Sequence, residues 1–461
     1  MADRTSLVIR EAIRQGLLGP EQPLAGFLDL DGLRRTVTDL HDAFAGPAPV
    51  LHAFAVKAAS LVPVLVLLAQ WGMGCEVAGP GELELAVAAG VPPERIVLDS
   101  PAKTAAELLR AVRLGVAVNA DNLQELGRID RLRGLGATSS TFGLRINPQV
   151  GAGAITAMST ATDTSKFGVA LRDPGARETV LRACLERPWL TRLHVHAGSQ
   201  GVPLELIAAA VRAVYELAEE INDKAGRMRI GSLDIGGGLP VNFVDDEVRP
   251  TFRDHVAALR RGVPGLLDGR YALVTEFGRA VLAKNGFIVA AVEYTKEAGG
   301  RRIAVTHAGA QVATRTVFRP DAWPLRVGAF DRQGRPKGEP VVAQDVAGPC
   351  CFAGDLVATR RPLPLLEPGD YVALYDTGAY YFSTPFGYNS LPRPAVHGFR
   401  TDPDPAGADA APRAAAVRFA TVRARQSLHE VAVESGLAQR DALRRLGAGL
   451  PVTRPQRRNQ P

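Results

Sequence analysis

The residue with the clearest chemical potential is Lys57, which lies in the apolar segment 54–58 (FAVKA) of a 461-residue chain. An ammonium group at the end of a buried strand is poorly solvated, so its pKa falls and the free amine can attack a carbonyl carbon. This placement favours a lysine that forms a Schiff base. The alternative is a lysine whose charged end simply extends from the top of a strand into water.

Two glycine-containing motifs follow later strands and suit a phosphate group. Three glycines at 236–238 come directly after the segment 232–235, and their backbone can turn tightly and direct N–H groups at an anion. The motif TEFGR at 275–279 offers a carboxylate, a close backbone approach and a guanidinium within a few positions. Glycine runs occur in many turns, so neither motif identifies a site by itself.

His194 and His196 are two positions apart in a predicted strand, so their side chains should point to the same face of it. Such a pair could bind a metal, but we find no convincing third ligand at the other strand ends and expect no metal site. A ring that stacks on a flat cofactor is a second functional interpretation. A core histidine that hydrogen-bonds a backbone carbonyl would explain the pattern equally well.

Short β-branched segments alternate with helical segments between residues 50 and 280, which predicts a parallel α/β domain. Eight such units fit a (β/α)8 barrel, whose active site lies where the strands end. Polar residues such as Lys57, Asp99 and Arg145 fall at those ends. The predicted strands span residues 50–57, 73–77, 95–99, 116–119, 141–147, 191–196, 232–235 and 272–276.

The sequence changes in character after residue 286. Short strands at 289–294, 302–306, 341–346 and 371–375 are separated by glycine and proline, which predicts a C-terminal β-sandwich or β-barrel domain without intervening helices. Residues 422–446 are expected to contain helices. The predicted organisation is an N-terminal segment packing on the β domain (1–45), the barrel (46–285), the β domain (286–400), and a linker with a basic, partly disordered tail (401–461).

Composition excludes several classes of protein. The net charge is +6 and the pI about 9.3, but acidic residues are interspersed throughout. No helix-turn-helix, zinc-finger or stacking-aromatic pattern accompanies the basic tail, so we expect no nucleic-acid partner. No window is long and apolar enough to cross a bilayer, so we expect no membrane association. Four cysteines, two of them adjacent, do not form a disulfide framework and favour a reducing cytoplasm.

Taken together and in this order, the motifs resemble the fold-type III pyridoxal-phosphate decarboxylases, which include diaminopimelate, ornithine and arginine decarboxylases. The resemblance runs from about residue 27 to residue 397 and includes SKFG at 165–168 and HAGS at 196–199. It implies a homodimer with shared active sites, a pyridoxal 5'-phosphate cofactor and α-decarboxylation of an amino acid. Such a cofactor accepts the electron pair left at Cα when CO2 departs.

The resemblance also implies a role for each site residue. Lys57 would bind the cofactor aldehyde, His196 would stack on the pyridine ring, and Glu276 would pair with the ring nitrogen and keep it protonated. Arg145 would lie near the ring, and Cys351 would reach the barrel mouth of a second subunit to handle the proton at Cα. The implied phosphate ligands are Ser199, Gly236, Gly237, Gly238, Gly278, Arg279 and Tyr380. The implied substrate contacts are Phe352 and Tyr388, with Arg315 and Arg319 as candidate carboxylate clamps.

Three positions depart from the family pattern: Phe277 replaces a proline, Glu76 an aspartate, and Phe352 the acid that follows the cysteine in diaminopimelate and ornithine decarboxylases. That acid pairs with the distal ammonium of the substrate, and loss of one partner of a buried pair costs about 3–5 kcal/mol. We therefore expect a substrate without a distal ammonium. It would be an amino acid or an aminoacyl group on an acyl carrier protein, as in the glutamyl-carrier-protein decarboxylase of butirosin biosynthesis, an antibiotic pathway.

Three alternatives to this substrate prediction remain open. The first is a meso-diaminopimelate decarboxylase of lysine biosynthesis. The second is a barrel racemase of the same cofactor class, which would retain the carboxylate. The third is a non-catalytic protein that binds pyridoxal phosphate and releases no CO2 from any amino acid.

Overall fold

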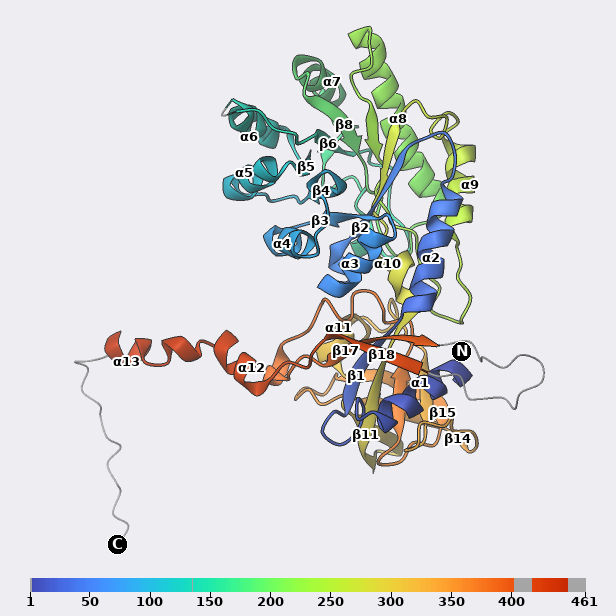
Figure 1. Ribbon diagram of the computed structural model, residues 1–461. Coiled ribbons are helices and arrows are strands. Elements are labelled where there is room, and N and C mark those ends of the chain that lie inside the picture. Colours follow the sequence, from blue (N-terminus) through green and yellow to red (C-terminus); the bar gives the residue numbers. More distant parts are fainter. Residues whose placement is uncertain (1, 135, 402–416, 447–461) are drawn as a thin grey trace, which may run out of the picture.

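The structure is a computed structural model that describes residues 2–134, 136–401 and 417–446. Figure 1 shows a barrel surrounded by helices above a second sheet, with a helical arm projecting to one side. Most of the linker predicted after residue 401 and the last residues of the tail lie outside the described residues.

The eight predicted strands form a closed parallel barrel, so this prediction is confirmed. Pairing of β10 with β2, and of β5 with β6, closes the ring. Both faces of the sheet are covered, which explains why the strands are almost continuously apolar. The barrel strands are β2 (Val50–Ala55), β3 (Gly74–Val77), β4 (Ile96–Asp99), β5 (Ala117–Ala120), β6 (Phe142–Asn147), β8 (Leu190–His194), β9 (Ser232–Asp234) and β10 (Ala272–Thr275); the short β7 (Val169–Ala170) extends from β6.

Helices cover the outside of the barrel between successive strands. They are α3 (Val62–Gln70), α4 (Pro80–Ala88), α5 (Ala105–Leu114), α6 (Leu123–Arg133), α7 (Ala176–Glu186), α8 (Leu204–Ala225) and α9 (Phe252–Gly262). After β10 the chain forms only the short α10 (Arg279–Leu282), and α2 (Leu30–Ala43) packs beside it and against α9. A helix that precedes the first barrel strand therefore completes the outer layer.

The second sheet contains strands from both ends of the chain. It follows the order β15-β14-β12-β11-β1-β17-β18, with β16 pairing with β11 and β13. Helix α1 (Ala2–Arg14) buries Val8, Ile9 and Ala12 in the same core cluster as Phe27 of β1. The strands are β1 (Leu24–Asp29), β11 (Gly286–Ala298), β12 (Arg301–Thr306), β13 (Val327–Phe330), β14 (Val341–Ala347), β15 (Leu356–Pro364), β16 (Tyr371–Leu374), β17 (Ala395–Thr401) and β18 (Val417–Arg423).

The expectation that no helix interrupts the β domain is wrong, because α11 (Ala310–Phe318) lies between β12 and β13. The sequence does not predict this helix, because four of its nine residues are β-branched and disfavour helix formation. A tertiary contact supports its start: the Ala310 N–H donates to Asp355 Oδ1 at 2.6 Å. The helix matters because it carries Arg315 to the barrel.

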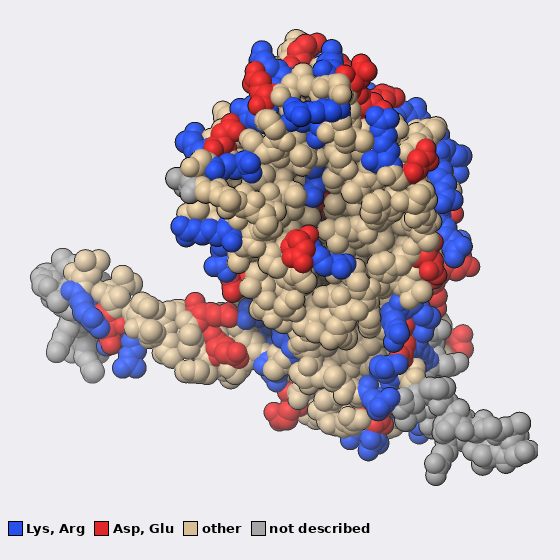
Figure 2. Space-filling model, turned by 45° about the horizontal axis from the view of Figure 1, so that its top comes forward, with Lys and Arg blue, Asp and Glu red and all other residues tan. Residues whose placement is uncertain are grey.

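The helices expected at 422–446 are present in part. Strand β18 extends to Arg423, and the arm that follows contains α12 (Leu428–Glu434) and α13 (Ala442–Leu446). Figure 2 shows positive and negative side chains interspersed on the face drawn, with a broad area of other residues between them. In the described part of the chain, none of the helices combines the length and apolar character that a membrane span requires.

Candidate active site

Lys57 lies just beyond β2, in the single turn η1 (Val56–Ala58), and its amine contacts the neighbouring strand. Because β2 and β3 are parallel with Ala55 opposite Glu76, the Glu76 carboxylate accepts two hydrogen bonds from Lys57 Nζ, at 2.8 and 2.6 Å. Burial acts to lower the pKa of Lys57, but the charges of Glu76, Tyr380 and Glu276 outweigh it and raise the pKa above its usual value. The lowered pKa expected from the sequence is therefore wrong for this structure.

The β domain holds the backbone around Lys57 in place. The Tyr380 N–H donates to Ala58 O at 2.7 Å, and the Ser383 hydroxyl donates to Lys57 O at 2.8 Å. Tyr380 has a φ of +70°, a conformation that non-glycine residues rarely adopt. Residues more than 300 positions apart thus place the amine and the Tyr380 ring on the same side of the site.

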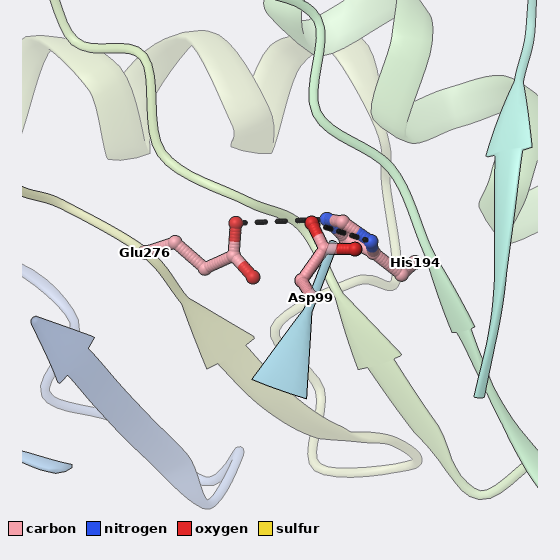
Figure 3. Close-up of side chains that lie close together, drawn as sticks. All are labelled: Asp99, His194 and Glu276. Atoms are coloured by element: carbon pink, nitrogen blue, oxygen red, sulfur yellow. Dashed lines mark ion pairs between the residues drawn. The ribbon is translucent and has the colours of Figure 1, made fainter. Parts of the chain in front are cut away.

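A buried group of charged and polar side chains forms the inner wall of the site; Figure 3 shows three of them, Asp99, His194 and Glu276. Arg145 on β6 donates to Asp99 Oδ2 at 3.0 Å, and both side chains are 6% exposed. Burial alone would raise the pKa of Asp99, but Arg145 and His194 lower it below its usual value. Glu276 follows β10; burial and the nearby charges of Glu76 and Asp99 raise its pKa well above the usual range.

His196 is held in the site by the glycine run. The Gly237 N–H donates to His196 Nδ1 at 3.1 Å, which leaves Nε2 as the protonated nitrogen of the neutral ring. Burial and the Arg145 charge lower the pKa of His196, which favours that neutral form. A Cβ at position 237 would lie 2.3 Å from Glu276 O, so only glycine fits between these two strand ends.

Two arginines meet beside the Tyr380 ring. The guanidinium groups of Arg279 and Arg315 lie 4.5 and 4.4 Å from the centroid of the Tyr380 ring, and 4.5 and 5.1 Å from that of Trp323. Nε and Nη1 of Arg279 and Nη1 of Arg315 are buried without hydrogen-bond partners. Burial lowers the pKa of Arg279 to about 10, with a smaller contribution from the Arg315 charge. Two cations with unused donors form an anion-binding site.

These groups surround one cavity of about 490 Å³. Most of the predicted site residues line it or lie directly beside it, although the sequence placed them on separate strands. Those that line it are Lys57, Arg145, His196, Ser199, Gly238, Glu276, Gly278, Arg279, Arg315 and Tyr380; Gly236 and Gly237 adjoin it.

Four predicted residues lie outside this cavity. Cys351 is exposed, and its N–H donates to Asn389 Oδ1 at 2.8 Å. Phe352 stacks on Phe318 with ring centroids 5.6 Å apart and contacts Tyr388 edge-on. Arg319 is exposed at the end of α11. In this chain the Phe352 ring therefore faces its own β domain and not the space beside Lys57.

Sequence reasoning overlooked three contributors to the site. Trp323 supports both arginines from a loop, and no pattern in the sequence marks it. Asp234 ends β9 inside the barrel, where burial and the charge of Glu276 raise its pKa to about 7. Lys166 also lines the cavity. The sequence could have indicated Asp234, because an aspartate within an apolar strand just before the glycine run is unusual.

The donor set fits pyridoxal phosphate. A lysine can hold an aldehyde, unpartnered guanidinium and glycine N–H groups can hold a phosphate, and a buried carboxylate faces the space between them. Together with the barrel, these residues define a pyridoxal-phosphate-dependent enzyme of the barrel type.

Comparison with known proteins identifies the family. Residues 30–283, more than half of the chain, match the pyridoxal-binding domain of the pyridoxal-dependent decarboxylases. Diaminopimelate decarboxylase of Pseudomonas fluorescens is 35% identical over 360 residues, which cover 76% of this chain and 82% of that protein. The Aquifex aeolicus enzyme is 30% identical over 349 residues, covering 75% and 80%. A solved structure of Helicobacter pylori diaminopimelate decarboxylase with L-lysine has a TM-score of 0.78 at 25% identity, covering 92% of this chain and 100% of that one.

The chain therefore belongs to the pyridoxal-dependent decarboxylase family, and it is an amino acid decarboxylase that uses pyridoxal phosphate. The predictions of fold, enzyme class and cofactor are confirmed. The prediction of a carrier-bound or non-ammonium substrate in antibiotic biosynthesis is wrong, because the similar proteins are diaminopimelate decarboxylases. Within one chain the Phe352 ring packs on Phe318 and does not line the cavity, and its role beside the site of a second copy stays a prediction.

Proposed function

We propose that this enzyme decarboxylates meso-diaminopimelate to lysine. Diaminopimelate carries two carboxylates, one of which leaves as CO2 while the other is retained. The relatives at 30–35% identity carry this name over most of their length. The observation that carries the proposal in this chain is a second cation at the cavity, the half-buried Arg315, whose Nη1 is buried without a partner beside the Tyr380 ring that Arg279 also contacts.

The two arginines would divide the anions between them. Arg279 adjoins the glycine run and Gly278, so we assign it to the cofactor phosphate together with Ser199 and the Tyr380 hydroxyl. Arg315 reaches the same cavity from α11 and still has an unpartnered donor. We assign that donor to the retained carboxylate of the substrate, because a guanidinium is suited to bind a carboxylate.

The remaining residues would orient the cofactor and control protons. Lys57 would bind its aldehyde carbon, the neutral His196 ring would pack on its face, and Glu276 would lie at its ring nitrogen. Bound there, pyridoxal phosphate would withdraw the electron pair that CO2 leaves at Cα. The buried Arg145–Asp99 pair would fix the wall of the site.

After CO2 leaves, Cα must receive a proton. None of the residues of one chain to which we have given a role in the cavity donates it. We propose that Cys351 of a second copy provides it in a homodimer. Its exposure supports this, as does an adjacent group of aromatic rings from Phe318, Phe352, Phe386 and Tyr388. Phe318 is 52% and Tyr388 39% exposed, and exposed aromatic groups of this kind are typical of protein interfaces.

The proposal is tested with purified holoenzyme and meso-diaminopimelate, measuring CO2 and lysine by mass spectrometry. We expect turnover, and we expect Arg315→Met to raise KM about 10- to 100-fold, because a charged hydrogen bond contributes about 1.5–3 kcal/mol. Arg319→Met is the matched control: it removes the same group four residues away, outside the cavity, and should leave KM unchanged. Absence of lysine formation by wild type would refute the proposed substrate.

A further inference from the structure

His194 is fully buried inside the barrel, in the polar group that faces the site, yet the roles assigned above do not use it. It is the last residue of β8, two positions before His196. Neither of its ring nitrogens has a hydrogen-bond partner. A buried polar ring without partners is costly, so its presence here needs a reason.

The ring lies between two carboxylates (Figure 3). Nδ1 is 3.6 Å from Asp99 Oδ2, and Nε2 is 3.6 Å from Glu276 Oε2. The three side chains are close enough to suggest a metal site, with ligand atoms within 4.8 Å of one another. However, the two carboxylates face opposite nitrogens of one ring, and a single ion cannot bind both nitrogens. A proton on each nitrogen fits this arrangement better.

The charges of Lys57 and Arg145 act on Glu276, but neither group forms an ion pair with its carboxylate within 4 Å in the described residues. In the described residues, the two ion-pair partners found within 4 Å of its carboxylate are His194 and His196. His196 presents Nδ1 to Glu276 at 3.9 Å, and that nitrogen already accepts the Gly237 N–H. Glu276 Oε1 has no hydrogen-bond partner. Only His194 therefore has a ring nitrogen available to carry a proton toward Glu276.

We propose that His194 is a positioning residue that keeps Glu276 ionised and oriented toward the cofactor ring nitrogen. The proton that Glu276 would otherwise take resides on His194 Nε2, while Nδ1–H faces Asp99. No other bond changes, since one proton moves from Glu276 Oε2 to His194 Nε2. This inference rests on the proposed role of Glu276.

The surroundings of the ring support a positive charge at this position. Asp99 from β4, Asp234 from β9 and Glu276 after β10 provide three acidic groups around it. Arg145 from β6 offsets one of them by its hydrogen bond to Asp99. The charge of His194 is among the factors that lower the pKa of Asp99, and it opposes the raised pKa of Asp234. The charged and titratable groups around the ring are Asp99, Arg145, His196, Asp234, Glu276 and Arg192; Arg192 lies two residues earlier on β8, and its charge acts on Asp234 and Glu276.

The test is the ¹⁵N spectrum of holoenzyme loaded with ring-labelled pyridoxal phosphate, recorded from pH 6 to pH 9 without substrate. Wild type should show a protonated ring nitrogen throughout. In His194→Gln the signal should move toward the unprotonated value as the pH rises. With substrate, kcat should fall about tenfold or more while KM changes less than about twofold, as expected when a transition-state interaction is lost. A His194→Gln signal identical to that of wild type would overturn the proposal.

His397→Gln is the matched control, because His397 is also buried with both ring nitrogens unpartnered, but lies on β17 in the other sheet. Its cofactor signal should equal that of wild type. Glu276→Gln separates the two proposals: if it leaves the ring nitrogen protonated, the role of Glu276 fails and the role of His194 fails with it. If Glu276→Gln shifts the signal and His194→Gln does not, only the inference about His194 fails.

If His194→Gln folds poorly, His194→Asn serves as a second variant, because the smaller asparagine side chain fits the space of the imidazole. Wild type also provides a direct measurement. At pH 8 an ordinary histidine is neutral, so the proposal predicts an imidazole with both nitrogens protonated in the spectrum of ¹⁵N-histidine holoenzyme. Absence of any such signal would overturn the proposal without the use of a variant.

Discussion

Replacement of Glu76 by glutamine should make Lys57 react faster with the cofactor aldehyde. In the structure the Glu76 carboxylate lies 2.6 Å from Lys57 Nζ and holds the amine in its protonated form. An ammonium is not a nucleophile, so the free amine fraction limits the reaction at neutral pH. Removing the charge of Glu76 lowers the pKa of Lys57 and raises that fraction.

The expected size follows from Coulomb's law. At the observed 2.6 Å, a unit charge pair contributes about 1.6 kcal/mol with the dielectric constant of water and about 6 kcal/mol with an effective value near 20. The Lys57 side chain is 43% exposed, so the lower figure applies. It corresponds to about one pKa unit, and hence to about a tenfold larger fraction of free amine.

The assay is stopped-flow absorbance after apoenzyme is mixed with pyridoxal phosphate, repeated from pH 6 to pH 9. At each pH in this range Glu76→Gln should react about tenfold faster than wild type, because Lys57 stays mostly protonated in both proteins and the free amine fraction rises as its pKa falls. Glu125→Gln is the control: Glu125 pairs with Lys103 at 3.1 Å, both nearly buried, outside the cavity. A profile of Glu76→Gln that coincides with wild type, or moves to higher pH, would refute this account of Lys57.

Two further predictions concern the exposed thiol and the buried ion pair. Cys351→Ala should retain the absorption band of the lysine-bound cofactor but lose most turnover, about 10²-fold or more, as expected for a proton donor; Cys184→Ala, at a buried helical site, is the control. Asp99→Asn leaves Arg145 buried without its partner and should lower the free energy of unfolding by about 3–5 kcal/mol at pH 7. Because folding lowers the pKa of Asp99, its stabilisation is complete above the pKa of the unfolded chain, near 4, and is lost as pH falls further.

Full activity of Cys351→Ala would remove the thiol from the mechanism. For Asp99→Asn, urea unfolding of the apoenzyme at pH 7 and pH 3 measures the effect. The difference from wild type should shrink at the lower pH, and an unchanged difference would contradict the ion-pair explanation.

Much of the barrel was predictable from local sequence. Alternation of apolar strands and helices located all eight strands, because both faces of a parallel sheet are buried and each strand is almost continuously apolar. Since an active site of this fold lies at the strand ends, the positions of Lys57, Arg145 and Glu276 followed from the same pattern.

Helix α11 shows where local pattern was insufficient. Its β-branched residues predict a strand or a loop. The start of the helix is supported by a hydrogen bond from the Ala310 N–H to the distant Asp355 carboxylate. The position of Arg315 in the cavity therefore could not be derived from its neighbours in the sequence. Tertiary context overrides propensity at such sites.

The sequence alone predicted the barrel and Lys57 as the candidate Schiff-base lysine, because these depend on residue type and on position along a strand; the resemblance of its motifs predicted the cofactor. Tertiary structure decided what surrounds each group. It placed Glu76 against Lys57, turned the Phe352 ring onto Phe318, and set His194 between two carboxylates. Such contacts join residues from different strands, so they depend on how the barrel closes and on the register between its strands, which no local pattern specifies.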